Sequence, residues 1–205
     1  ISSLMKKRPA MKVGVIGLGV GTIAAYGRSG DSITFYEINP DVRDATERFF
    51  TYLKDSLAKI EVVLGDGRLS LEREAPRGFD LLVADAFSGD AVPVHLVTKE
   101  AWELYLRHLK ADGVIAFNTS NTYLDLRPVI LRIAKELDLK ATIIKSGDGL
   151  KELDTQRAEW ILVAKSGEVL DDDMIKKAAA KEEVLFNDGH LWTDNFSNLL
   201  KIVRW

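Results

Sequence analysis

The chain of 205 residues contains no cysteine, and this absence excludes three kinds of chemistry. Disulfide bonds, thiolate nucleophiles and cysteine-based zinc sites all need a sulfur that the chain lacks. The three histidines, His95, His108 and His190, lie far apart in the sequence and form no metal-ligand motif. Because a chain without disulfides suits a reducing compartment, we expect a cytoplasmic protein. Because the chain has neither cysteine ligands nor a histidine motif, we expect that it uses no metal.

Long apolar runs and an excess of basic residues are missing as well. No stretch reaches the roughly 18 apolar residues of a membrane-spanning helix, and the sequence has no signal-peptide pattern. The net charge of -3 provides no basic surface for a nucleic-acid backbone, so we expect no nucleic-acid partner. The first residue is Ile1 rather than Met, and we therefore expect a piece of a longer protein.

The most informative feature that is present is an apolar run that ends in alternating glycines. Residues 12–17 are apolar and β-branched, which predicts a buried strand, and they lead into Gly17, Gly19 and Gly21. Glycines let the backbone turn sharply and approach a ligand with no Cβ in the way. A second apolar run ends in Glu37, about 20 residues after Gly17. A carboxylate there can accept hydrogen bonds from both ribose hydroxyls, so the pattern predicts an adenosine-type ligand. A tight turn with a surface glutamate is the structural alternative.

Apolar runs alternate with amphipathic stretches along the rest of the chain. We expect strands over 12–17, 32–37, 60–64, 79–84, 114–118, 141–145 and 160–164, and helices over 20–28, 40–53, 68–74, 98–109, 124–137 and 171–180. The last two strands have no room for a helix between them, so they are antiparallel neighbours. The pattern predicts an α/β fold with a mainly parallel seven-stranded sheet, an antiparallel last strand and helices on both faces. We expect a single domain over residues 1–205.

Polar residues follow the third predicted strand, in Gly65-Asp66-Gly67. Ligands of such sheets bind beyond the carboxyl ends of the strands, so Asp66 is expected near Glu37. Its carboxylate can accept a hydrogen bond from an adenine amino group, or it can simply belong to an Asp-Gly turn. A dinucleotide fingerprint would place glycine where the chain has Thr22. This difference favours a mononucleoside such as S-adenosylmethionine over a hydride-transfer cofactor.

Two carboxylates follow the fourth predicted strand. Asp85 ends the strand, and Asp90 lies five residues later on a loop with glycine and proline. A carboxylate here can bind a cationic amine or accept its proton. The alternative is that Asp85 caps the strand end and Asp90 is solvated. The nearby His95 fits loop packing better than catalysis.

These segments resemble the spermidine/spermine synthase (polyamine aminopropyltransferase) family, within the S-adenosylmethionine-dependent methyltransferase superfamily. The resemblance runs over residues 11–205 and rests on four motifs. They are Gly17-Leu18-Gly19-Val20-Gly21 at the family's glycine loop, Glu37-Ile38-Asn39-Pro40 at its ribose-binding Glu-Ile-Asp segment, Asp66-Gly67 at its adenine-contacting pair, and Phe79–Asp85 at the strand that ends in its catalytic aspartate. Val20 stands where the family has an aspartate.

The resemblance implies a Rossmann-like fold, a transferase activity and a set of site residues. Asp85 and Asp90 would be catalytic, and Gly17, Gly19, Gly21, Glu37, Ile38, Asp66, Gly67 and Asp85 would bind S-adenosylmethionine or its decarboxylated form. The implied reaction is aminopropyl transfer to a polyamine, without a metal. Two alternatives stay open, a methyltransferase on the same nucleoside site and a non-catalytic nucleoside-binding or scaffolding domain.

The resemblance also bears on partners. The stretches 85–109 and 192–200 look like bacterial spermidine synthase-like proteins, which are often fused to membrane segments. The chain carries no counterpart of the family's small N-terminal β domain, which supplies polyamine contacts and part of the oligomer interface. A small-molecule amine or polyamine acceptor, a homodimer and an upstream domain that tethers the chain to a membrane are therefore the implied partners. The segment 192–200 either closes over the acceptor or packs on the core, and packing is favoured.

Overall fold

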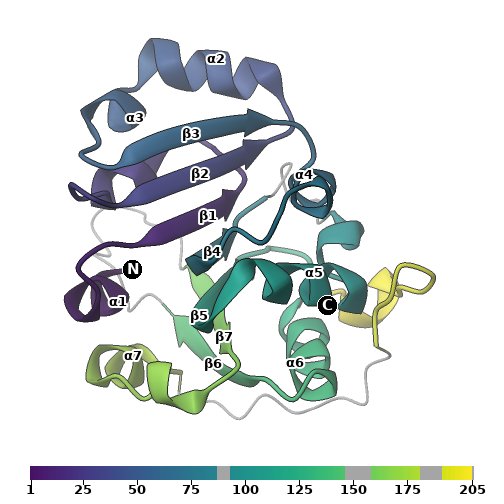
Figure 1. Ribbon diagram of the computed structural model, residues 1–205. Helices are drawn as coiled ribbons and strands as arrows, with labels where there is room; N and C mark the ends of the chain where they lie inside the picture. The colour runs from purple at the N-terminus through teal and green to yellow at the C-terminus, as the bar shows by residue number, and fades with distance from the viewer. Residues whose placement is uncertain (87–92, 146–157, 181–190, 205) are drawn as a thin grey trace, which may run out of the picture. The chain divides into compact units, whose positions relative to one another are not determined.

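The computed structural model describes residues 1–86, 93–145, 158–180 and 191–204 (Figure 1). Seven strands form one sheet in the order β3-β2-β1-β4-β5-β7-β6. The strands are β1 (Lys12–Ile16), β2 (Ser32–Glu37), β3 (Lys59–Leu64), β4 (Phe79–Ala84), β5 (Leu109–Asn118), β6 (Lys140–Lys145) and β7 (Glu159–Ala164). The pairs that involve β1, β2 and β3 are parallel, whereas β7 runs antiparallel to both β5 and β6. The predicted sheet is confirmed.

The chain divides into two compact units, which we describe separately. Unit 1 comprises residues 1–86 and 104–113, and unit 2 comprises the described residues of 87–103 and 114–205. Among the described residues, none of the helices is both long and apolar enough to cross a membrane. The expectation of one domain over residues 1–205 stays a prediction.

The centre of unit 1 is a buried parallel sheet. All six residues of β4 and five of the six in β2 are buried, whereas β3 at the edge is half-exposed. Strands with both faces buried are nearly continuous apolar runs, and this is why the strands could be predicted from the sequence. Around them lie α1 (Ser2–Lys7), the 3-10 helix η1 (Thr22–Tyr26), α2 (Pro40–Phe49), α3 (Tyr52–Asp55) and α4 (Gly67–Arg73). Figure 1 shows α2 and α3 beside β3, and α4 near the arrowheads of the strands.

Two helices of unit 1 are shorter than the sequence predicts. The expected helix over 20–28 is the single 3-10 segment η1, because Gly21 before it is left-handed and Gly27 after it is extended. The expected helix over 40–53 divides into α2 and α3, because Phe50 has extended backbone angles. The start of α2 is as predicted, with Pro40 in the first turn and the Asn39 side chain accepting a hydrogen bond from the Asp41 N–H at 2.9 Å.

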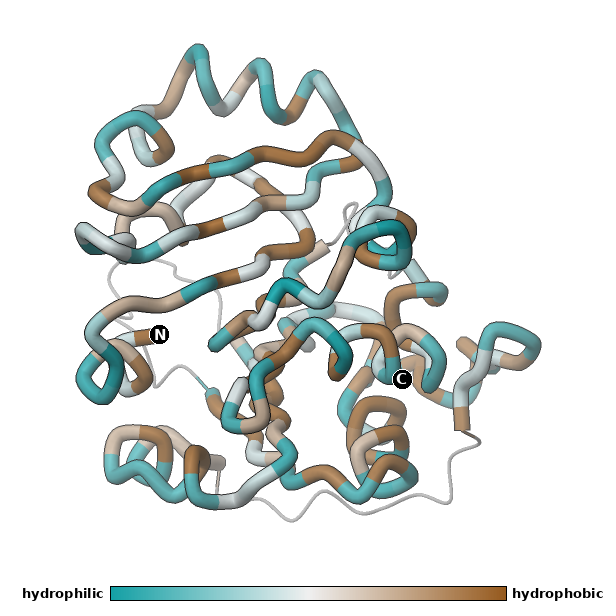
Figure 2. The backbone as a smooth tube through the Cα atoms, viewed as in Figure 1, coloured by the Kyte–Doolittle hydropathy of each residue, from teal (hydrophilic) through white to brown (hydrophobic). Residues whose placement is uncertain are grey.

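Unit 2 is built on β6, β7 and the later part of β5. Its helices include the first half of α5 (Lys99–His108), and α6 (Arg127–Glu136) and α7 (Asp173–Ala178). Stacked rings of Trp102 and Phe117, with centroids 6.0 Å apart, join α5 to β5 in the core. Figure 2 shows the hydrophobic residues of the strands and of α6 that surround this core. The predicted helix over 124–137 begins only at Arg127, because the Asn121 side chain holds the Tyr123 and Leu124 N–H groups in a loop.

The C-terminal segment caps the start of α5. The Lys99 N–H donates to the Trp192 carbonyl at 2.9 Å, and the Thr98 hydroxyl donates to Asp194 Oδ1 at 2.7 Å. Thr98 also accepts the Ala101 N–H, as expected of the N-cap residue. Trp192 is buried, so at least this part of the segment 192–200 packs on the fold.

A buried carboxylate ties the N-terminal segment to the sheet of unit 1. Asp80, only 2% exposed, accepts hydrogen bonds from the Lys12 N–H at 2.7 Å and from Lys110 Nζ at 2.8 Å, and it pairs with Arg8. Arg8 also pairs with Asp112, which is 69% exposed. The two aspartates share a cation but differ in burial.

We expect Asp80→Ala to lower the free energy of unfolding by about 3 kcal/mol, because the Lys12 N–H and the largely buried Arg8 lose their acceptor. The matched variant Asp112→Ala removes only an exposed pair and should cost less than about 1 kcal/mol. Urea denaturation of both variants measures the difference. Equal losses would contradict the assigned role of Asp80.

The imidazole of His108 is buried beside Phe79 and is 1% exposed. Burial penalises its charged form and lowers the pKa of His108 below the ordinary value of 6.5, while a hydrogen bond with the Leu71 backbone opposes this more weakly. Near pH 6, His108 therefore binds a proton more readily in the unfolded chain than in the folded chain. The contribution of neutral His108 to stability is complete above pH 6.5 and is lost as the pH falls through the lower, folded-state pKa.

We expect the free energy of unfolding to fall below pH 6.5, with His108 contributing at most about 1.4 kcal/mol per pH unit. In His108→Phe this part of the slope should vanish, whereas His95→Gln, at an exposed position, should keep it. Urea denaturation between pH 7 and pH 5 compares the slopes. An unchanged slope in His108→Phe counts against the assignment.

Candidate functional site

The carboxyl ends of β1 to β4 lie along one edge of unit 1. The Gly17 N–H donates to the Tyr36 carbonyl at 2.9 Å, and the Asp85 N–H donates to the Ile16 carbonyl at 2.9 Å. The Gly65 N–H donates to the Glu37 carbonyl at 2.8 Å, which continues the row to β3. The backbone segments that carry four of the predicted motifs are therefore neighbours on one edge.

The glycine turn after β1 depends most strongly on Gly17. Its φ is +98°, and a Cβ there would lie 2.4 Å from the Asp85 carbonyl oxygen. Gly19 and Gly21 also have positive φ, but a Cβ on Gly19 would meet nothing within 4 Å. The Thr46 hydroxyl donates to the Gly19 carbonyl at 2.6 Å and holds the turn against α2. Packing therefore requires glycine at position 17, whereas the space around Gly19 is open.

Glu37 connects the glycine turn to the end of β2. Its side chain is 7% exposed; Oε2 accepts the Leu18 N–H at 2.9 Å, and Oε1 accepts the Asn39 N–H at 2.8 Å. An ionised carboxylate offers about four acceptor sites, so these two bonds leave acceptor capacity on both oxygens. The alternative of a surface glutamate is wrong, because this carboxylate is buried and bound to backbone on two sides.

Asp66 has a structural task at the start of α4. Its Oδ1 accepts the Leu69 N–H at 2.9 Å and caps the helix. A Cβ on Gly67 would lie 2.7 Å from the Ile16 side chain, so glycine is needed for close packing on β1. Two apolar side chains near these carboxylates in the sequence remain in solvent: Ile38 is 68% exposed, and Leu69 is half-exposed. Exposed apolar groups beside carboxylates suit a flat, partly polar ligand.

Asp85 is half-buried at the end of β4, and it has further side-chain or electrostatic interactions in the fold. Asp90, predicted as the second carboxylate of the acceptor loop, lies outside the described residues. His95 is exposed on the short 3-10 helix η2 (Val94–Leu96). Across the described ranges, no group of three or more His, Asp or Glu side chains could hold a metal ion.

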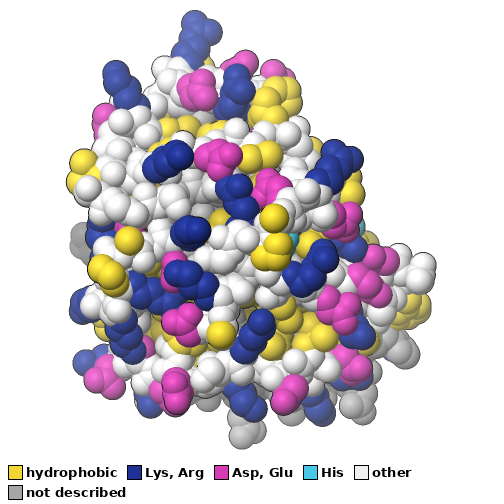
Figure 3. Space-filling model, viewed as in Figure 1, with side chains coloured by type: hydrophobic (Ala, Val, Ile, Leu, Met, Phe, Trp, Pro, Cys, Tyr) yellow, Lys and Arg dark blue, Asp and Glu magenta, His cyan; other side chains and the backbone are white. Residues whose placement is uncertain are grey.

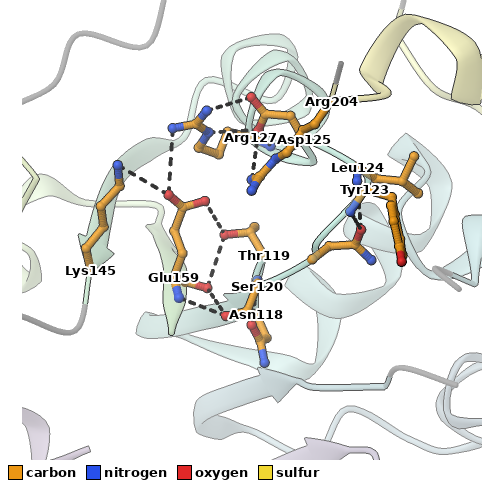
Figure 4. Close-up of polar contacts among 11 residues, drawn as sticks. Asn118, Thr119, Ser120, Tyr123, Leu124, Asp125, Arg127, Lys145, Glu159 and Arg204 are labelled. Carbon is orange, nitrogen blue, oxygen red and sulfur yellow. Dashed lines mark hydrogen bonds and ion pairs between the residues drawn. The ribbon is translucent and has the colours of Figure 1, made fainter. Parts of the chain in front are cut away.

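A polar network in unit 2 was missed by the sequence analysis (Figure 4). Its centre is Glu159 at the start of β7, which accepts the Thr119 hydroxyl at 3.0 Å and pairs with Arg127 at 3.7 Å and Lys145 at 3.6 Å. Asp125 binds Arg127 through two hydrogen bonds of 2.7 Å. The polar run Asn118–Asn121 after an apolar strand was the available signal. The network braces the loop after β5, at the carboxyl end of that strand.

No protein-family model matches the chain. Two curated proteins are similar in sequence. A polyamine aminopropyltransferase of Vibrio vulnificus (strain CMCP6) is 31% identical over 115 residues, which cover 53% of this chain and 37% of that protein. An N-terminal histidine N-methyltransferase of Emericella nidulans is 36% identical over 105 residues, or 51% of this chain and 19% of that protein. The chain thus spans well under half the length of either relative.

Solved structures are similar over nearly the whole chain. Spermidine synthase from Thermotoga maritima superposes with a TM-score of 0.63 at 16% identity and covers 94% of this chain and 66% of its own. Human methyltransferase-like protein 13 in complex with SAH superposes with a TM-score of 0.61 at 18% identity. The match covers 94% of this chain and 89% of the human chain. The chain has the Rossmann-like fold of S-adenosylmethionine-dependent methyltransferases. Spermidine synthases share this fold, and the predicted resemblance to polyamine aminopropyltransferases is confirmed.

We expect Gly17→Ala to lower the free energy of unfolding by more than about 3 kcal/mol, because the methyl group meets backbone at a positive φ. The matched variant Gly19→Ala has positive φ but open space, so it should cost about 1–2 kcal/mol. Denaturant unfolding of the two variants tests the ranking. A reversed order would show that the turn relaxes freely at Gly17.

Proposed function

We propose that this chain is a transferase domain that binds an S-adenosylmethionine-type nucleoside at the carboxyl edge of unit 1. The observation that carries the proposal is Glu37, a buried carboxylate bound to the glycine turn and retaining acceptor capacity toward a diol. Two ribose hydroxyls are the donors that such a carboxylate accepts. Both curated relatives are named as transferases, which supports the reaction class.

The other predicted residues complete the proposed nucleoside site. The backbone of Gly17–Gly21 accommodates the ligand beside the turn, and the open space at Gly19 is the entry. Ile38 and Leu69 offer apolar contacts to the adenine, and the carboxylate of Asp66, beyond its helix-capping bond, accepts from the adenine amino group. Each of these roles uses a group that the fold already holds in place.

We propose aminopropyl transfer from decarboxylated S-adenosylmethionine to a polyamine as the reaction. The neutral amine nitrogen attacks the methylene carbon next to the sulfonium, a C–N bond forms, and the C–S bond breaks with its electron pair going to sulfur. Methylthioadenosine leaves as a neutral thioether, and the new ammonium gives up a proton. Asp85 orients the amine and accepts this proton, and Asp90 binds the distal ammonium. Most of the rate enhancement comes from holding amine and sulfonium in line.

Methyl transfer is the second candidate, and the 36% identity to a histidine N-methyltransferase favours it. The nucleoside site would be the same, but the acceptor would attack the methyl carbon and S-adenosylhomocysteine would leave. The two reactions differ in whether the co-substrate carries a carboxylate. Binding preference for the carboxylated or the decarboxylated form therefore separates them.

We expect calorimetric titration to show decarboxylated S-adenosylmethionine binding roughly tenfold or more tighter than S-adenosylmethionine. Glu37→Ala should abolish measurable binding of the nucleosides, including methylthioadenosine, whereas Glu47→Ala, on the exposed side of α2, should leave it unchanged. Asp85→Asn should reduce aminopropyl transfer to putrescine or spermidine at least about 100-fold, and the exposed Asp41→Asn should not. Circular dichroism establishes that each variant is folded.

The opposite preference, for the carboxylated form, would replace aminopropyl transfer by methyl transfer. Binding without turnover for any amine would favour the non-catalytic nucleoside-binding domain. If none of the three nucleosides binds the folded chain, the nucleoside site itself is refuted.

A further inference from the structure

Unit 1 contains a pocket of about 600 Å³ at a different part of the sheet from the Glu37 edge. Lys12, Ser32 and Lys59 are the first residues of β1, β2 and β3, and they line it. Ser32 pairs in register with Lys12 on one side and with Lys59 on the other, so the three form a row across adjacent strands. The row lies at the amino ends of strands whose carboxyl ends carry the proposed nucleoside site.

The sheet face beside this row is unusually polar for a parallel sheet. The next row along the strands contains Thr34 and Glu61, paired in register, where apolar side chains covered by a helix are the rule. The helix α4 ends at Arg73, and the following residues, Glu74–Arg77, form one wall of the pocket. The face of unit 1 seen in Figure 3 carries interspersed basic and acidic side chains.

The acidic groups of the pocket already have partners within the fold. Arg77 Nη2 donates to Glu61 at 2.6 Å and to Thr34 at 2.8 Å, and its Nε lies 3.5 Å from Glu74. The Tyr36 hydroxyl donates to Glu74 at 2.8 Å. The hydrogen bond from Arg77 lowers the pKa of Glu61, so this carboxylate stays ionised and bound to the guanidinium. Each carboxylate therefore contacts Arg77, and Glu74 also accepts the Tyr36 hydroxyl.

Donors at the row of first residues remain available. In the described part of the chain, neither the Lys12 ammonium nor the Ser32 hydroxyl makes a side-chain hydrogen bond or ion pair. Lys59 has an electrostatic interaction with Glu61, which itself is held by Arg77. The pocket lining therefore contains three cationic side chains and two anionic ones, Glu61 and Glu74. Its net charge is positive, and it has more hydrogen-bond donors than its own acceptors use.

We infer that this pocket binds a small organic anion, with its phosphate or carboxylate group between Lys12 and Lys59 and bonded to the Ser32 hydroxyl. Neighbouring strands lie roughly 4.8 Å apart, so lysines on the two strands flanking Ser32 can approach one anionic group from both sides. The carbon skeleton packs on the apolar wall of Ala75, Pro76 and Phe79. The volume is in the range of pockets that hold small-molecule ligands.

The test is calorimetric titration of the full chain at low ionic strength with inorganic pyrophosphate and, separately, with citrate. We expect saturable binding of at least one probe, and the probe that binds tells phosphate from carboxylate recognition. The double variant Lys12→Gln/Lys59→Gln should raise Kd roughly tenfold or more, and Ser32→Ala should raise it less. The matched control is Lys54→Gln/Lys177→Gln, which removes the same two charges at exposed lysines of α3 and α7 and should leave Kd unchanged.

Absence of saturable binding of both probes to the wild-type chain would overturn the proposal. So would equal affinity in the double variant and the control, because the binding would then be a general effect of net charge. Glu37→Ala should bind the anion as the wild-type chain does, so the result is independent of the nucleoside site. Unfolding curves of each variant separate lost binding from lost structure.

Discussion

The carboxylate of Glu37 joins two backbone segments that the sheet alone does not hold together. One oxygen takes the N–H of Leu18 in the glycine turn, and the other takes the N–H of Asn39, which caps α2. A buried charge is tolerated only when it is hydrogen-bonded, and here backbone donors supply the bonds. This side chain therefore links the turn to the start of α2, together with the hydrogen bond from Thr46 to the Gly19 carbonyl. Glu37 therefore has a structural role beside its proposed role in ligand recognition.

The strands of unit 1 carry opposite chemistry at their two ends. Acceptors follow the carboxyl ends, in Glu37 and Asp85, whereas the amino ends begin with Lys12 and Lys59. The residues between the two ends are mostly buried and apolar, apart from the polar Thr34 and Glu61, and they stabilise the strands. The proposed nucleoside and anion pockets are thus held by the same rigid strands, without sharing a residue.

The sequence allowed most of the fold to be predicted, because buried parallel strands are continuous apolar runs and their ends are marked by glycine or aspartate. Prediction was wrong where a local backbone angle decided the outcome, as at Phe50, which ends α2, and at Gly21, which limits η1. The neighbouring positions of the Gly17 turn, Glu37 and Asp85 follow from strand order and were foreseen. The network of Glu159 was not, because it joins β5, β6 and β7 through residues some 40 positions apart in the chain. Asp66 shows a different limit of sequence-based prediction. The Asp-Gly motif was interpreted as a ligand contact or a turn, and the structure shows that the aspartate caps α4. The sequence alone does not distinguish a folding role from a binding role.

The contacts of the last described residues have a consequence for synthesis on the ribosome. The start of α5 is completed by Trp192 and Asp194, and the loop after β5 is closed by hydrogen bonds that join Asp125 to Ile202 and Tyr123 to Arg204. These partners leave the exit tunnel well after Lys12 to Asp85, which can form their parallel sheet before them. A nascent chain stalled before residue 192 would therefore expose an unfinished unit 2, whereas all residues of unit 1 would already have been made. Such a chain would depend on chaperones for as long as translation was paused.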